Sequence, residues 1–253
     1  MKSPLKAKPL RNPGESLDIK LKDLLFADVL SYFIFAIFMV AIALMEWVKW
    51  FTDSPPNPKV FTAVALIALL IAGWKFERTK ARIKSLKLGR DGEKAVGQYL
   101  ERLREAGAKV FHDIPGGGFN IDHVVIHETG MYVIETKTIS KPDRGEAKLV
   151  YDGTNVFKNG FAPDRNPIQQ VRAAKHWLSE LMKESAGRKF PMRAVVVYPG
   201  WFIQPTAEAK SSDVWVLNPK ALPGFISKSA PQITPEDVHL CAYHLGRYIR
   251  TAN

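Results

Sequence analysis

The sequence predicts an α/β protein in which a mixed sheet is flanked by helices and preceded by two transmembrane helices. Three observations predict this class. Two long apolar runs lie in the N-terminal third, and the remaining chain alternates segments of helical and strand periodicity. The third is the presence of one cysteine, Cys241, among 253 residues. One cysteine excludes an intramolecular disulfide framework and any multi-cysteine metal site, so the fold must rest on packing.

The N-terminal third has the pattern of a membrane hairpin. No charge occurs in the 17 residues between Asp28 and Glu46, nor in the 15 residues between Lys59 and Lys75. Both runs are near the short end of what crosses a bilayer, for which about 20 residues is usual. Two buried core helices are the alternative, but neither run has the polar face that a globular helix turns to water.

The charges that flank the two runs predict their orientation. Six basic residues lie in 1–23 and seven in 75–90, whereas the loop 46–59 is balanced. The positive-inside rule therefore places both termini in the cytoplasm and predicts a two-span protein of the cell (inner) membrane. Residues 54–58, with three prolines, suit a short external turn. We expect 75–90 to extend the second helix and to contact anionic lipid, with a DNA-contacting patch as the alternative.

The net charge of +11 follows the same division. The first 90 residues carry +8 and the rest only +3, so most of the basic excess lies beside the predicted membrane segment. The predicted organisation is a basic tail at 1–23, a transmembrane hairpin at 24–76, a basic juxtamembrane linker at 77–88 and a folded domain at 89–253.

The folded domain alternates helix and strand along the chain. Apolar spacing predicts a helix at 91–105, and Asn166 followed by Pro167 predicts the start of another. Segments rich in Val, Ile, Phe and Tyr between glycine-containing turns predict strands. In order, the expected elements are a helix at 91–105, strands at 109–114, 120–127 and 131–138, a hairpin at 147–156, a helix from 166, strands at 193–198 and 214–217, and a helix at 235–250.

The central hairpin carries the chemistry. A two-residue turn at Glu128 and Thr129 places Asp122 opposite Glu135, with Lys137 on the same face. Two carboxylates about 5 Å apart repel each other, and a hard divalent cation such as Mg²⁺ relieves the repulsion. In the alternative, Lys137 forms a plain salt bridge with one carboxylate and Asp122 caps a turn. Spacing alone leaves both interpretations open.

Four motifs in order resemble the nuclease-related domain (NERD) family and, through Asp and Glu-x-Lys on adjacent strands, the PD-(D/E)xK nucleases. The motifs are Gly89-Arg90-Asp91-Gly92-Glu93, Asn120-Ile121-Asp122-His123-Val124-Val125, Val133-Ile134-Glu135-Thr136-Lys137 and Asn166-Pro167-Ile168-Gln169-Gln170-Val171. The resemblance implies a restriction-endonuclease-like fold and Mg²⁺ or Mn²⁺ as cofactor. It also implies that Asp122 and Glu135 are metal ligands.

The same resemblance implies that Lys137 orients or deprotonates the attacking water, that Glu93 is an additional acidic residue of the site and that Gln170 belongs to it. Each of the last two has a structural alternative. The helix dipole favours a carboxylate near a helix start, as predicted for Glu93, and Gln170 heads an apolar stripe that points to the core. Gln169 is better explained as a capping-box partner, and His123 as a structural strand residue.

The resulting hypothesis is a membrane-anchored, metal-dependent nuclease that hydrolyses phosphodiester bonds of nucleic acid, with DNA as the favoured partner. The alternative is a non-catalytic nuclease-like module that binds nucleic acid or a protein at the membrane. A charge of +3 over residues 91–253 is weak for a tight DNA binder and favours the alternative. Asp122, Glu135 and Lys137 favour the enzyme, because a binding module has no physical reason to keep repelling carboxylates.

Overall fold

The computed structural model describes residues 10–52, 57–141, 146–163 and 165–252. The chain divides into two compact units. One comprises Ser16–Leu88, and the other holds the described residues up to Glu15 and from Gly89 onward. Most of the predicted external turn at 54–58 lies outside the described residues.

The described part of residues 16–88 is helical except for Thr52 and Asn57, which flank the turn. Helix α1 (Glu15–Leu25) passes through a π-helical turn, Phe26–Leu30, into α2 (Ser31–Phe51). After the turn, α3 spans Pro58–Glu105 without a break, so the juxtamembrane linker predicted at 77–88 is helical, as expected for an extension of the second span. At the end of the π-helical turn, the hydroxyl of Ser31 donates a hydrogen bond of 2.9 Å to the carbonyl of Phe26, five residues earlier.

Helices α2 and α3 pack against each other through small residues. Ala36 on α2 and Ala68 and Ala72 on α3 are buried together, whereas the large apolar side chains around them point outward. Lys75 pairs with Asp28 at 3.6 Å between the helices. Small residues at the contact and large apolar residues outside are typical of helices packed in lipid, where water provides no force to bury the larger side chains.

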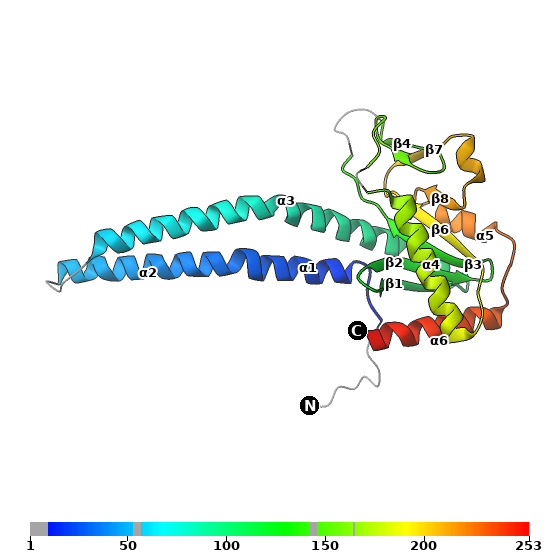
Figure 1. Cartoon of the computed structure of the whole chain (residues 1–253), viewed down its shortest axis with the longest axis horizontal. Helices are drawn as coiled ribbons and strands as arrows, with labels where there is room; N and C mark the ends of the chain where they lie inside the picture. Colours follow the sequence, from blue (N-terminus) through cyan, green and yellow to red (C-terminus); the bar gives the residue numbers. More distant parts are fainter. Residues whose placement is uncertain (1–9, 53–56, 142–145, 164, 253) are drawn as a thin grey trace. The chain divides into compact units, whose positions relative to one another are not determined.

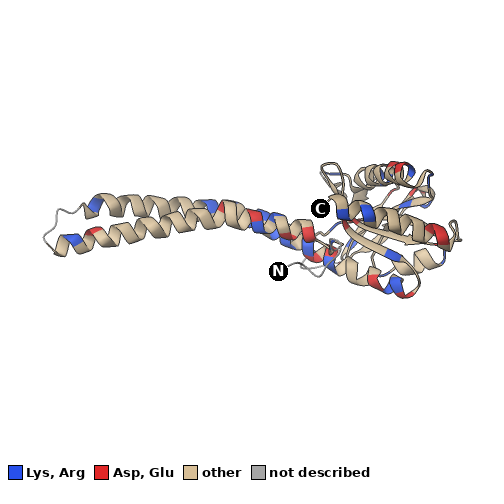
Figure 2. Cartoon of the chain, turned by 90° about the horizontal axis from the view of Figure 1, so that it is seen from below, with Lys and Arg blue, Asp and Glu red and all other residues tan. Residues whose placement is uncertain are grey.

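Two helical segments, Glu15–Phe51 and Pro58–Glu105, are long and apolar enough to cross a membrane. Figure 2 shows the apolar stretch in tan, with charged residues at the turn and at the opposite end of the two helices. This finding rests on length and composition, and it agrees with the predicted pair of spans without fixing their topology.

The second unit is built on a five-stranded mixed sheet, as predicted. The strand order is β1-β2-β3-β6-β8, in which β1, β2 and β3 are antiparallel neighbours and β3, β6 and β8 are parallel. The strands span Lys109–Pro115 (β1), Asn120–His127 (β2), Gly130–Thr136 (β3), Met192–Val197 (β6) and Val214–Leu217 (β8).

Helices cover both faces of this sheet (Figure 1). On one face, α4 (Pro167–Ala186) and α6 (Pro235–Ala252) bury a core that includes Val124 and Val133. On the other face, the end of α3 and the short α5 (Leu222–Ser227) bury a second core that includes Val125 and Ile134. Strand β3 is buried along its whole length, because its two faces are both covered.

A second, smaller sheet has the order β5-β4-β7. Its strands are β4 (Lys148–Tyr151), β5 (Val156–Phe157) and β7 (Phe202–Pro205), followed by a short 3₁₀ helix at Glu208–Ser211. The hairpin of β4 and β5 confirms the prediction for 147–156. Neither β7 nor α5 was predicted, because β7 is largely exposed and lacks alternation, and α5 has only six residues with Pro and Gly among them.

Candidate active site

The site lies at the end of the β2–β3 hairpin that is farthest from its turn. Pairing from His127↔Gly130 to His123↔Ile134 follows the predicted register, in which the two residue numbers sum to 257. The next positions along the two strands are Asp122 and Glu135, where the ladder ends. Instead, the carboxylate of Asp122 accepts a hydrogen bond from the backbone N–H of Thr136, at 2.7 Å from Oδ2.

The neighbouring strand is irregular at the same level. Asp113 on β1 has a φ of +50°, and ladder pairing skips from His112↔His123 to Ile114↔Ile121. Ile121 packs with the α4 and α6 core and not with the opposite face, where strict alternation along β2 predicts it. Ile121 departs from this alternation because a left-handed residue, Asp113, interrupts the regular pleat beside it.

Lys137 joins two of the predicted site residues. Its Nζ donates to Oε1 of Glu135 at 2.7 Å and to Oε1 of Gln170 at 2.8 Å. Glu135 is buried, with 5% of its side chain exposed, whereas 29% of the Lys137 side chain reaches solvent. The structure thus contains the ion pair that the alternative interpretation of the sequence describes, with Gln170 as its third member.

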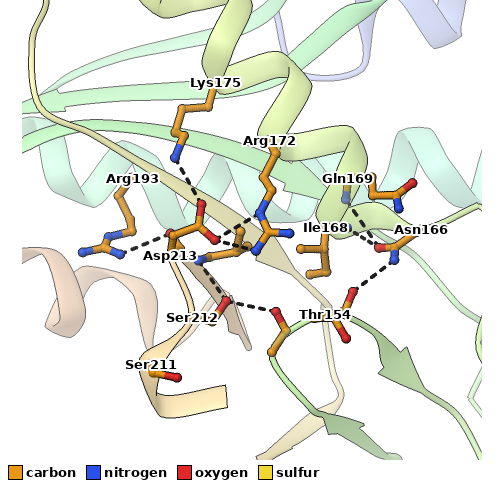
Figure 3. Close-up of polar contacts among 12 residues, drawn as sticks. Thr154, Asn166, Ile168, Gln169, Arg172, Lys175, Arg193, Ser211, Ser212 and Asp213 are labelled. Atoms are coloured by element: carbon orange, nitrogen blue, oxygen red, sulfur yellow. Dashed lines mark hydrogen bonds and ion pairs between the residues drawn. The ribbon is translucent and has the colours of Figure 1, made fainter. Parts of the chain in front are cut away.

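The apolar stripe of its helix suggested that Gln170 points into the core, but the side chain is exposed. It lies beside Lys137, whose Nζ donates to it. Asn166 caps this helix as predicted, and its Oδ1 accepts from the backbone N–H of Ile168 at 2.9 Å (Figure 3). The cap therefore fixes the turn that carries Gln170.

A basic cluster holds α4 to the start of β8. Figure 3 shows Arg172 and Lys175 of the helix pointing to Asp213, at 3.0 Å from Nε of Arg172 and 3.3 Å from Nζ of Lys175. The hydrogen bond from Arg172 is the main cause of the lowered pKa of Asp213. Arg193 donates to the Asp213 carbonyl at 3.1 Å. These bonds add to the cap in fixing the position of α4.

Acidic side chains gather at the end of the hairpin. The pKa of Asp122 is raised well above its usual value, first by burial, then by the negative charge of Glu135 and then by that of Glu93. Burial also raises the pKa of Glu135, against the opposing effect of Lys137. Because Glu135 and Glu93 both disfavour the charged form of Asp122, these three residues form one electrostatic group.

Glu93 is buried in the interior of α3, with 8% of its surface exposed. The explanation by a helix dipole is wrong, because α3 begins 35 residues earlier, at Pro58. Close packing brings this part of α3 to the segment after Lys137, since a Cβ on Gly92 would lie 1.8 Å from Oγ1 of Thr138. The glycine is therefore required where the helix passes the loop.

His123 is a structural residue, as predicted. It is fully buried, and its Nδ1 lies 2.8 Å from Nδ1 of His112 on β1. The other ring nitrogen of His112 lies 3.1 Å from Oε1 of Glu101 on α3. Burial lowers the pKa of both histidines, and for His123 it does so well below the usual value of 6.5. Both rings are therefore neutral at physiological pH.

Tyr198 is a site neighbour that the sequence analysis missed. It follows β6, which pairs with β3 in parallel through Glu135↔Val196, and it is 1% exposed. Burial, followed by the negative charge of Glu135, raises the pKa of its hydroxyl. No sequence signal links Tyr198 to Glu135, because β4, β5 and α4 separate β3 from β6 along the chain.

Two carboxylates of the site could bind a divalent cation. Among the residues that the structure describes, no group of three or more His, Cys, Asp or Glu side chains is arranged to hold a metal ion by itself. Asp122 and Glu135 do supply two carboxylates whose charges oppose each other. Two carboxylates fit Mg²⁺ or Mn²⁺, because such ions keep several waters and complete their coordination with substrate phosphate.

Comparison with known families finds a match for part of this chain. The family model described as the nuclease-related domain, NERD, matches residues 88–199 and confirms the predicted resemblance for this segment. The match includes Glu93, Asp122, Glu135, Lys137 and Gln170.

One relative is an uncharacterized protein of Bacillus anthracis, 33% identical over 103 residues. The match covers 36% of this chain and 47% of that protein, so the chain spans about half the length of this relative. Among solved structures, Pyrococcus furiosus SfsA in complex with Ca²⁺ is similar over 52% of this chain and 55% of its own, at 20% identity and a TM-score of 0.26. Similarity at this level carries no functional argument.

Proposed function

We propose that this protein is a membrane-anchored, metal-dependent nuclease that hydrolyses phosphodiester bonds, with DNA as its favoured substrate, at a site of the PD-(D/E)xK type. The observation that carries the proposal is the gathering of Asp122, Glu135, Lys137 and Gln170 at one end of the β2–β3 hairpin. A nuclease-related domain over the same segment supports it.

Asp122 and Glu135 would hold the cation. Bound there, Mg²⁺ or Mn²⁺ supplies positive charge to the phosphate and lowers the pKa of bound water. The two carboxylates are costly without a cation, because burial raises the pKa of both and the charge of Glu135 raises that of Asp122 further. A cation at this place therefore relieves a cost already present in the fold.

Lys137 is the residue that would act on the attacking water. Its ammonium group lies against Glu135 and is partly open to solvent, so it can exchange a protein acceptor for water or a phosphate oxygen. Gln170 accepts from the same ammonium and would hold it in position. Glu93 would act through its charge on Asp122, adding to the preference of the site for a cation.

The unit of residues 16–88 would anchor the domain in the membrane. Large apolar side chains cover the outside of α2 and the first half of α3, where lipid can accept them. The excess of Lys and Arg on the flanks would place both termini and the nuclease-related domain in the cytoplasm. The basic residues of 75–90 would then face the anionic headgroups of the inner leaflet.

A non-catalytic module that binds nucleic acid or a protein partner is the second candidate. The specific observation in its favour is the ion pair of Lys137 with Glu135, which compensates one carboxylate without any metal. In this case, the site would be a structural pair, and residues 89–253 would serve only for recognition.

Cleavage by the full chain in detergent micelles distinguishes the two candidates. We expect wild type to cut DNA with Mg²⁺ or Mn²⁺ and to stop in EDTA, and Asp122→Asn and Glu135→Gln each to abolish cutting. Glu128→Gln is the matched control, because Glu128 is exposed in the turn at the other end of the same hairpin. Parallel RNA substrates test the substrate preference. Cutting that survives both site substitutions, or its absence in wild type with either metal, would contradict the proposal.

A further inference from the structure

A cavity of about 550 Å³ lies beside the candidate active site. It is walled mainly by apolar side chains from the loop after Lys137, the small sheet and the segment after β5. The lining residues that matter are Ile139, Leu149, Lys158, Phe161 and Tyr198. The size is within the range of pockets that take small organic groups, about 300 to 1,000 Å³.

The walls of this cavity are tied together. Backbone bonds in both directions between Lys158 and Phe161, at 2.9 and 3.0 Å, close a tight turn over Asn159 and Gly160. Both central residues have positive φ, at 51° and 80°, which is the geometry that an Asn-Gly pair favours. This turn presents Phe161, whose side chain is 79% exposed although it lines the cavity.

The ammonium group of Lys158 lies beside the same cavity. Lys158 Nζ donates to the carbonyl of Ser140 at 3.2 Å and lies 5.2 Å from the ring centre of Trp201. Trp201 in turn donates to the carbonyl of Ile139 at 3.2 Å. The cavity thus combines apolar walls, an exposed aromatic ring and a positive charge.

The cavity adjoins the candidate site along the backbone. Ile139, two residues after Lys137, and Tyr198 both line it. The backbone N–H of Lys137 donates to the carbonyl of Val197, directly before Tyr198, at 2.9 Å. A strand with its phosphate at Lys137 would therefore have its next groups beside the cavity.

We propose that this cavity takes an unpaired base of the nucleic acid whose phosphodiester bond is cut, so that single-stranded or locally opened nucleic acid is the substrate class. The inference rests on the proposed function. An unpaired base has a flat apolar face that stacks on an aromatic ring such as Phe161, and the adjoining phosphate is complementary to the charge of Lys158. A base inside an intact duplex cannot enter such a pocket without leaving the stack.

The test is binding of fluorescent oligonucleotides of about 12 nucleotides to the full chain in micelles, with EDTA to prevent cutting. A single strand, its duplex and single strands with one abasic position are compared. We expect Phe161→Ala to weaken single-strand binding by about 5- to 150-fold, the range for losing one stacked base, and Phe161→Trp to retain it. Tyr243→Ala is the matched control, since Tyr243 is an exposed aromatic residue of α6 outside the cavity.

The deciding measurement is whether the loss caused by Phe161→Ala and the loss caused by an abasic position depend on each other. We expect one abasic position to weaken wild type as much as Phe161→Ala does and to cause no further loss in that variant. Additive losses, or equal affinity for duplex and single strand, would overturn the inference. Wild-type cutting of intact duplex with Phe161→Ala unimpaired would overturn it while leaving the proposed function standing. Coupled binding without any metal-dependent cutting would instead support the pocket and reject the nuclease.

Discussion

Replacing Lys137 by Met should lower the stability of the metal-free protein, because it leaves the charge of Glu135 without a partner. The substitution removes the ammonium that lies 2.7 Å from Glu135 and leaves a carboxylate of which only 5% is exposed. Removing one partner of a fully buried pair costs about 3 to 5 kcal/mol. Lys137 is 29% exposed, so water already screens the pair, and we expect the metal-free protein to lose about 1 to 3 kcal/mol.

Hydrogen exchange of the β3 amides in the full chain measures this loss, because β3 is buried throughout. A loss of 1 to 3 kcal/mol corresponds to exchange about 5- to 150-fold faster. Lys210→Met, at an exposed position on the 3₁₀ helix, is the matched control and should leave exchange unchanged. Glu135→Gln combined with Lys137→Met removes both charges and should restore most of the stability.

Mg²⁺ separates the two interpretations of the same pair. A cation that binds only the folded state adds about 2.7 kcal/mol at 100 times its Kd, so saturating Mg²⁺ should return the Lys137→Met variant close to wild type. Its cleavage rate should still be lower by about 10²- to 10⁴-fold, as expected for losing a positioned electrostatic or acid–base group. A variant that Mg²⁺ fails to stabilise would refute the reasoning, because Glu135 would then be only half of a structural ion pair.

Three further predictions follow from the same structure. In metal-free protein, Asp122→Asn should raise the free energy of unfolding, measured by hydrogen exchange, more at pH 8 than at pH 4. The reason is that the pKa of Asp122 is raised in the folded state, so the wild type loses stability as the pH rises through that value. An equal effect at both pH values would exclude charge repulsion as the cause. Below pH 6.5 the wild type should lose stability by up to about 1.4 kcal/mol per pH unit, because His123 binds a proton in the unfolded chain but stays neutral when buried. His123→Gln should reduce this loss. His239→Gln, at an exposed position, should leave it unchanged. A cysteine placed at Ser54, in a Cys241→Ser background, should react with an impermeant reagent added outside intact cells and one at exposed Ser185 should not; reversed labelling would reject the predicted topology.

The sheet was predictable because its signals are local. Strands β2 and β8 have the expected bounds, and Asn166 caps α4 as its sequence predicts. The register of β2 and β3 followed from a two-residue turn and the two-residue period of a strand. These features depend on neighbours along the chain, which is the information that a sequence displays directly.

The site was only partly predictable, because its remaining contacts are long-range. Tyr198 reaches Glu135 through parallel pairing of β3 with β6, and Gln170 meets Lys137 across 33 residues. The apolar stripe of α4 correctly located the core but could not show that Gln170 is exposed beside Lys137. The extension of the second span through 75–90 was predicted, but not that it and the helix expected at 91–105 form one unbroken helix, α3.

The most direct test of the central claim is Mn²⁺ binding by the full chain in micelles, followed by electron paramagnetic resonance at neutral pH. The account predicts one Mn²⁺ per wild-type chain, loss of binding in Asp122→Asn and Glu135→Gln, and binding largely retained in Lys137→Met. The anionic ligands are removed in the first two variants only, so the asymmetry identifies the carboxylates as the metal site. Wild type that binds no Mn²⁺, or equal binding in all four proteins, would contradict the account.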